Sequence, residues 1–105
     1  MDRYDGKPFL RLIECYVLES IGMLNDRQRQ VLQLMEPKLS TTFGVEGTWW
    51  DMVVEQMHFP ASLPGDIRGM WDKYQIAAHE QHVTPDPEEF AIMFIDHNFP
   101  DIVSD

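Results

Sequence analysis

Apolar residues recur every three or four positions along most of this chain, the spacing that places side chains on one face of an α-helix. The clearest run consists of Ile67, Met70, Trp71, Tyr74, Ala77 and Ala78. No segment alternates apolar and polar residues strictly enough to indicate a half-buried strand. We therefore expect an all-α fold, organised as an irregular bundle of five to six short amphipathic helices.

Prolines and capping residues divide this pattern into separate helices. Asn25 is followed three residues later by Gln28, which is the spacing of a capping box, and Asp86 precedes Pro87 at a second helix start. Pro37 is expected to end or kink its helix, because proline lacks the N–H of a helical hydrogen bond. The expected helices span residues 8–22, 26–36, 49–58, 64–81 and 87–98, with a further short one over 37–43.

Other local signals support these boundaries. Gly22 is suited to stop the first helix, and Thr48 followed by Asp51 resembles another capping box. Asn98 is suited to end the last helix in the left-handed conformation. Three apolar residues of the second helix are expected to form its buried stripe: Val31, Leu32 and Met35.

The length and composition of the chain indicate one hydrophobic core. It has 105 residues, of which 44% are hydrophobic, so we expect a single helical domain over residues 1–105. Its first residues carry charges of both signs, and no run reaches the roughly 18 to 20 apolar residues of a membrane helix. These features predict a cytoplasmic protein with no membrane partner. Cys15 is the only cysteine, which excludes an internal disulfide and favours an inert buried thiol.

The net charge of −10 is unevenly distributed. All eight Lys and Arg residues lie at or before Lys73. Seven acidic residues follow without a basic one: Glu80, Asp86, Glu88, Glu89, Asp96, Asp101 and Asp105. This balance disfavours direct nucleic-acid binding, which requires neutralisation of phosphates. The acidic third is interpreted either as a solvated face or as a docking surface for a basic protein partner.

One candidate metal pair is Glu55 with His58. The Glu-x-x-His spacing places a carboxylate and an imidazole on one face of a helix, and helical di-metal proteins use that unit twice. Here it occurs once, because none of the other three histidines follows a glutamate at this spacing. The pair therefore favours an ordinary histidine at the surface or the core edge over a metal ligand.

The second candidate set combines His79 and His82 with Asp86 and Glu89. Two imidazoles three residues apart, with carboxylates from the next helix, could share a metal ion. Their spacing is one residue short of the His-Glu-x-x-His motif, which excludes that class of metalloprotease. A structural role at a helix end is favoured, and a cluster that responds to pH between 5 and 8 is an alternative.

Catalytic signatures are missing from the local sequence. No recognised nucleophile motif surrounds a serine, cysteine or lysine, and the glycines do not have phosphate-cradling spacing. We assign no catalytic residue and expect no cofactor. A metal-dependent or small-molecule activity at His79 and His82 is the first alternative function. The second is an acidic mimic of nucleic acid that inhibits a DNA-binding protein.

The aromatic residues and methionines favour an interaction function. Adjacent Trp49 and Trp50 lie about 100° apart on a helix, so Trp50 can point away from the core. We predict a non-catalytic acidic helical module that binds a protein partner, of which a basic protein is one kind, or a second copy of itself. Its candidate contact residues are Trp50, Glu88 and Glu89. If Trp50 anchors the partner, Trp50→Ala should weaken association and leave stability nearly unchanged.

Overall fold

The computed structural model describes residues 8–101 and contains helices but no strand in that range. The helices are α1 (Pro8–Ser20), α2 (Asp26–Phe43), α3 (Trp49–Met57), α4 (Leu63–Glu80) and α5 (Pro87–Asn98). The all-α prediction is confirmed, and the helices form one globule with dimensions of 46 × 27 × 27 Å. Predictions about the charged residues 1–7 and about Asp105 lie outside the described residues.

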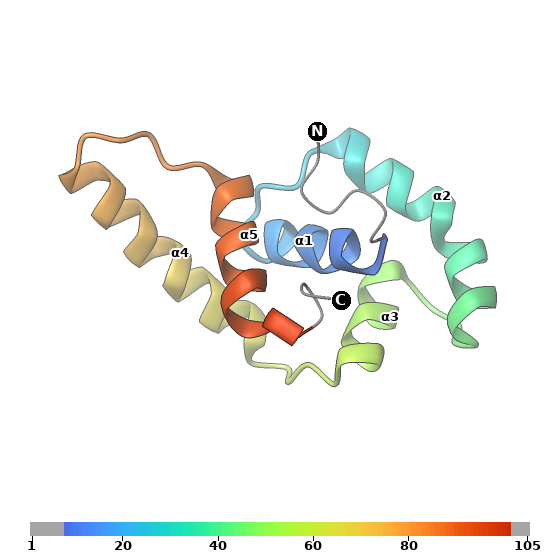
Figure 1. The fold of residues 1–105 in the computed structure, drawn as a ribbon. Coiled ribbons are helices and arrows are strands. Elements are labelled where there is room, and N and C mark those ends of the chain that lie inside the picture. Colours follow the sequence, from blue (N-terminus) through green and yellow to red (C-terminus); the bar gives the residue numbers. More distant parts are fainter. Residues whose placement is uncertain (1–7, 102–105) are drawn as a thin grey trace.

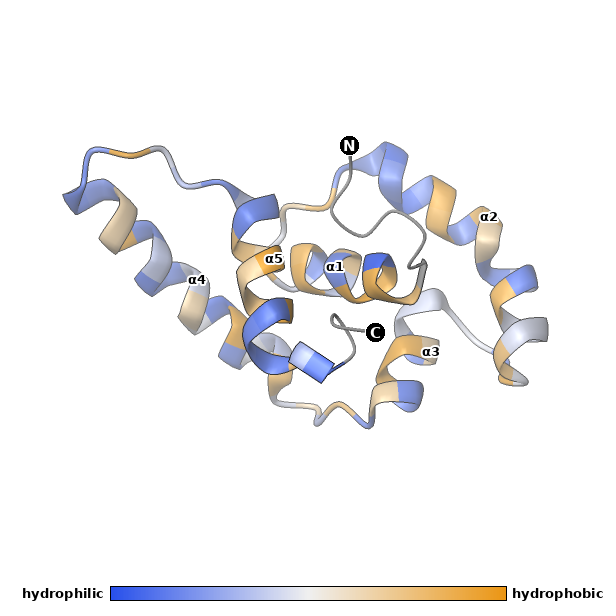
Figure 2. Cartoon of the chain, viewed as in Figure 1, coloured by the Kyte–Doolittle hydropathy of each residue, from blue (hydrophilic) through white to orange (hydrophobic). Residues whose placement is uncertain are grey.

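Helix α1 occupies the centre of the globule. Figure 1 shows α2 and α3 on one side of α1 and α4 and α5 on the other, and α1 contacts α3, α4 and α5. Its buried residues point in nearly every direction around the helix axis: Leu10, Leu12, Ile13, Tyr16, Val17, Leu18 and Ser20. A helix that is apolar on most of its circumference must be covered on several sides. Figure 2 shows this contrast, since α1 is largely apolar whereas α2 and α4 carry many polar residues.

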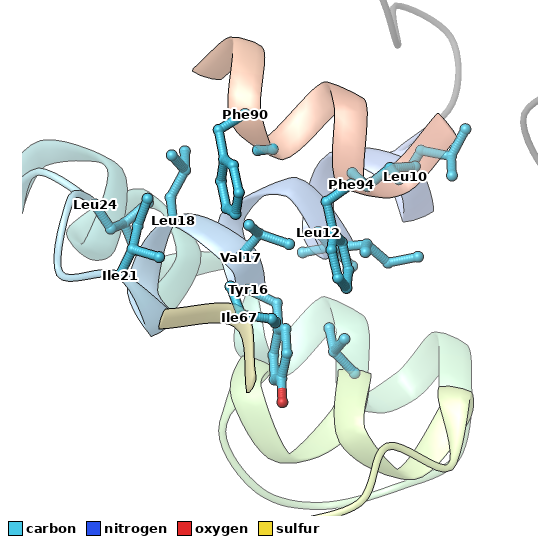
Figure 3. Packing of buried hydrophobic residues seen from close by; sticks show 14 of the residues in the cluster. Leu10, Leu12, Tyr16, Val17, Leu18, Ile21, Leu24, Ile67, Phe90 and Phe94 are labelled. Carbon is cyan, nitrogen blue, oxygen red and sulfur yellow. The ribbon is translucent and has the colours of Figure 1, made fainter. Parts of the chain in front are cut away.

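Aromatic side chains close the core between α1, α4 and α5. Phe90 and Phe94 of α5 point toward α1 in Figure 3, close to Val17. Phe90 also meets Trp71 of α4 edge-to-face, with ring centroids 5.3 Å apart. Such pairs contribute about 0.5–1.5 kcal/mol beyond the burial of their area. These contacts hold α4 and α5 against the same side of α1.

The end of α1 is fixed by both local and distant hydrogen bonds. Gly22 adopts φ 73°, and the Met23 N–H donates to the Leu18 carbonyl at 2.9 Å, which is the hydrogen bond of a left-handed helix end. Arg68 of α4 donates its Nε–H to the Ser20 carbonyl at 2.8 Å. The expected stop at Gly22 is thus present, although the last helical residue is Ser20.

The start of α3 has acceptors from two parts of the chain. The Asp51 N–H donates to Thr48 Oγ1 at 3.2 Å, which is one of the two hydrogen bonds of the predicted capping box. The Trp49 N–H instead donates to Glu36 Oε2 of α2 at 2.7 Å. A carboxylate near a helix N-terminus also interacts favourably with the helix dipole. Glu36 therefore connects α2 to α3 at the point where α3 begins.

Of the two alternatives for Pro37, the end of a helix is wrong, and so is the separate short helix over 37–43; the predicted left-handed conformation of Asn98 is also wrong. Pro37 does not end a helix, because α2 continues through it to Phe43, and Leu39 and Phe43 pack against the core. This packing outweighs the hydrogen bond that proline removes, and α2 changes direction along its length in Figure 1. Asn98 ends α5, but its φ is not positive, and its side-chain amide donates to the Phe94 carbonyl at 2.8 Å.

Replacing Pro37 with alanine is expected to raise the free energy of unfolding by about 2 kcal/mol. Alanine restores a helical N–H and removes a steric clash, a gain of about 3 kcal/mol, part of which is lost because the unfolded chain becomes more flexible. Chemical denaturation measures the difference. Pro64→Ala is the matched control, because Pro64 lies in the first turn of α4, where the N–H has no helical partner. Equal effects of the two substitutions would contradict this account.

Candidate functional site

An apolar groove runs between α1 and α2. It encloses about 280 Å³ and is lined by Arg11, Leu12, Cys15, Asn25, Arg27, Gln28, Val31, Leu32 and Met35. The groove exists because α2 packs mainly against α3 rather than along α1. Leu12 and Leu32 are buried, whereas Cys15 is only half-buried, so the expectation of a fully buried thiol is wrong.

An exposed apolar ridge on α2 borders this groove. Val31 is 48% exposed, Met35 is 38% exposed and Leu34, one turn beyond Val31, is 81% exposed. The predicted buried stripe of α2 is therefore wrong at two of its three positions, since only Leu32 is buried. One sequence signal was available: Leu32 and Leu34 lie about 200° apart on a helix, so one helical face cannot bury both. We call Val31, Leu34 and Met35 the α2 ridge.

Basic side chains flank the groove and the ridge. Arg11 and Arg27 line the groove, and both are exposed, as is Lys38 one turn beyond Leu34. Arg29 of α2 hydrogen-bonds to both carboxylate oxygens of Glu19 at 3.0 Å. The hydrogen bond to Glu19 is the main cause of a raised pKa of the Arg29 guanidinium. The groove is thus a basic region in a protein whose net charge is −10.

Trp50 lies at the edge of the core. Its ring stacks on Tyr16 with centroids 4.2 Å apart and meets Trp49 edge-to-face at 5.9 Å. Trp50 is half-buried, whereas Trp49 is buried. Burial also raises the pKa of the Tyr16 hydroxyl above its ordinary value. The indole of Trp50 therefore contributes to packing against α1.

The other two predicted contact residues lie on a different helix. Glu88 and Glu89 are exposed in the first turn of α5, and their N–H groups donate to Asp86 Oδ1 at 3.0 and 3.5 Å. This confirms Asp86 as the predicted helix cap. Figure 1 shows α3 and α5 on opposite sides of α1. The structure consequently does not bring Trp50 together with the two glutamates.

The first candidate metal pair is separated by the end of α3. Glu55 is helical, but His58 lies beyond Met57 with φ 55° and ψ 41°. The expected common helix face is therefore absent for Glu55 and His58. In residues 8–101, no three side chains of His, Cys, Asp or Glu are grouped closely enough to hold a metal ion.

The second candidate set is also divided by a helix end. His79 belongs to α4 and lines a shallow hollow with Ile76 and Pro85, whereas His82 lies beyond α4 with φ 58°. Asp86 caps α5 and Glu89 lies in its first turn. The set is thus distributed over the end of one helix and the start of the next.

His58 and His82 share a backbone conformation that the sequence did not indicate. They are the only non-glycine residues with positive φ in the part of the chain that the structure describes. After His82, the Val83 N–H donates to the Ala78 carbonyl at 2.8 Å, and after His58 the Phe59 N–H donates to the Val54 carbonyl at 3.0 Å. Glycine usually occupies this position of a helix end.

Comparisons of this chain with protein-family models, with curated proteins and with solved structures found no match. Across residues 8–101, none of the helices combines the length and the apolar character that a membrane span requires. The functional argument consequently rests on the residues themselves.

Replacing His82 with glycine is expected to raise the free energy of unfolding by up to about 1 kcal/mol. The left-handed conformation costs an L-residue about 1–2 kcal/mol, and glycine adopts it without that cost. His79→Gly is the matched control, since His79 is helical and glycine there should lower stability by about 0.5–1 kcal/mol. Thermal denaturation of both variants measures the difference, and a loss of stability with His82→Gly would contradict the structural role of this position.

Replacing Trp50 with alanine is expected to lower the free energy of unfolding by about 2 kcal/mol, because the stacked contact with Tyr16 is lost. This differs from the nearly unchanged stability expected of an anchor with no role in packing. Trp50→Phe should lower the free energy of unfolding by less than half as much as Trp50→Ala does, since a smaller ring can still stack on Tyr16. Urea denaturation followed by circular dichroism measures the stability of both variants. An unchanged midpoint for Trp50→Ala would contradict the packing role, and Trp50 would again be a candidate residue for binding a partner.

Proposed function

We propose that this protein is a non-catalytic interaction module that binds an amphipathic helix of another polypeptide in the groove between α1 and α2. The observation that carries this proposal is the α2 ridge, with Leu34 81% exposed beside an apolar groove. Exposed apolar patches bordered by polar residues are typical of protein interaction sites. A helix that lies in an apolar groove is a common mode of peptide recognition.

The shape of the site defines the ligand. Arg27 and Lys38 lie at the two ends of the ridge and are eleven residues apart, which corresponds to about 17 Å along a helix. A ligand helix of about three turns covers this length. The flexible Met35 side chain suits a surface that adapts to apolar side chains of different shapes.

The charges of the site define the polar part of the ligand. Arg27 and Lys38 flank the apolar surface, so a ligand with acidic residues beside its apolar face is favoured. This proposal differs from the expected basic partner, because basic side chains flank the apolar groove although the chain as a whole is acidic. Asp86, His58 and His82 have positions at helix ends, and these structural roles support a function without catalysis.

The test uses two synthetic amphipathic helices of about 14 residues, long enough for four turns. Both carry leucines on one face, which glutamates flank in one peptide and lysines flank in the other. We expect the glutamate peptide to shift the NMR signals of α1 and α2 around the groove and to bind at least tenfold more tightly than the lysine peptide.

Val31→Glu should abolish this binding, because it introduces an acidic group into the apolar surface. Gln30→Glu is the matched control, since it adds the same charge at an exposed position about 100° around the helix from Val31. Signals shifted elsewhere, or equal binding by Val31→Glu and the intact protein, would exclude the groove as the binding site.

A further inference from the structure

The outer face of α4 has the character that the groove favours in a ligand. Ile76 is 59% exposed, and Asp72 and Glu80 lie one helical turn before and after it. Both acidic residues are exposed. Asp72, Ile76 and Glu80 therefore form a stripe with an apolar centre and acidic ends, which we call the α4 stripe. Val83, 56% exposed, follows just beyond the end of α4.

The α4 stripe is not used by the core of its own chain. Helix α4 buries Ile67, Trp71 and Ala78, and these residues lie on the side of the helix opposite Ile76. Figure 1 shows α4 at one side of α1 and α2 at the other, so the stripe and the α2 ridge belong to different ends of the molecule. A chain cannot bring its own α4 stripe to its own α2 ridge without unfolding.

We propose that the occupant of the groove is the α4 stripe of a second copy of this chain, which produces a head-to-tail assembly. This inference rests on the proposed function of the groove. The α2 ridge of one copy packs on Ile76 of the next, and the basic groups that flank the ridge face Asp72 and Glu80. The acidic pair spans about 12 Å and the basic pair Arg27 and Lys38 about 17 Å along their helices, so the acidic groups fit within the length between the basic ones.

The two surfaces determine the symmetry of the assembly. Because the ridge and the stripe are different patches, the contact is heterologous, and a pair keeps a free stripe on one copy and a free ridge on the other. Such a contact generates a linear chain or a closed ring instead of a two-fold dimer. The 46 Å long dimension of the molecule is consistent with surfaces at opposite ends.

The net charge limits the strength of the contact. Two copies at −10 each repel one another at long range, whereas the facing charges attract only at short range. At about 0.15 M salt, the screening length of about 8 Å suppresses the repulsion more than the attraction between groups in contact. We therefore expect weak, concentration-dependent association that is stronger at this salt concentration than at very low salt.

The test is sedimentation velocity of the full chain from about 10 μM to about 1 mM, the range of weak association. The weight-average mass of the intact protein should rise with concentration. Val31→Glu in the ridge and Ile76→Glu in the stripe should each weaken association at least tenfold. Gln30→Glu and Ala77→Glu are matched controls at exposed neighbouring positions, and both should associate as the intact protein does. Circular dichroism establishes that every variant is folded.

Mixing the two defective variants gives the decisive result. The Val31→Glu chain retains its α4 stripe and the Ile76→Glu chain retains its groove, so an equimolar mixture should form dimers that cannot extend further. A two-fold contact between α2 ridges predicts the opposite, since Ile76→Glu alone would still associate and mixing would rescue nothing. A monomeric intact protein at every concentration overturns the assembly. In that case, binding of the acidic amphipathic peptide in the groove would show that the proposed function stands without it.

Discussion

The burial of α1 on nearly all sides is the constraint on which the rest of the structure depends. Its apolar residues point in too many directions for a single neighbouring helix to cover them, so α3, α4 and α5 all pack against it. Distant residues complete the helix ends, since Arg68 of α4 caps the last turn of α1 and Glu36 of α2 caps the start of α3. The outer helices are thus positioned by their contacts with α1 and by the hydrogen bonds of Arg68 and Glu36.

The same arrangement leaves apolar surface outside the core. Contacts with one or two neighbours cover only part of the circumference of a helix, and both α2 and α4 carry apolar residues on a second face. On α2 this produces the ridge with Leu34, and on α4 it produces the stripe centred on Ile76. The surfaces proposed to bind are therefore by-products of how α1 is enclosed, and their opposite charges distinguish them from ordinary exposed apolar residues.

Local signals predicted much of the fold. The capping box at Asn25 and the caps at Thr48 and Asp86 act within three residues, so their hydrogen bonds follow from the nearby sequence. Pro37 shows where this reasoning fails, because packing of Leu39 and Phe43 against distant helices keeps α2 continuous. The candidate site was less predictable, since the exposure of Val31 and Met35 depends on which of the other helices α2 packs against.

The sequence by itself determined that the chain is helical, where most helices begin, and that its acidic charge is concentrated toward the C-terminal third. These properties depend on periodicity, capping and composition, which act over a few residues. Only the tertiary structure decided which apolar residues are buried and that His58 and His82 lie at the ends of helices. It also decided where an apolar groove flanked by basic residues opens between α1 and α2. Burial depends on contacts between segments far apart in the chain, and no local pattern specifies which of two apolar faces a helix turns toward its neighbours.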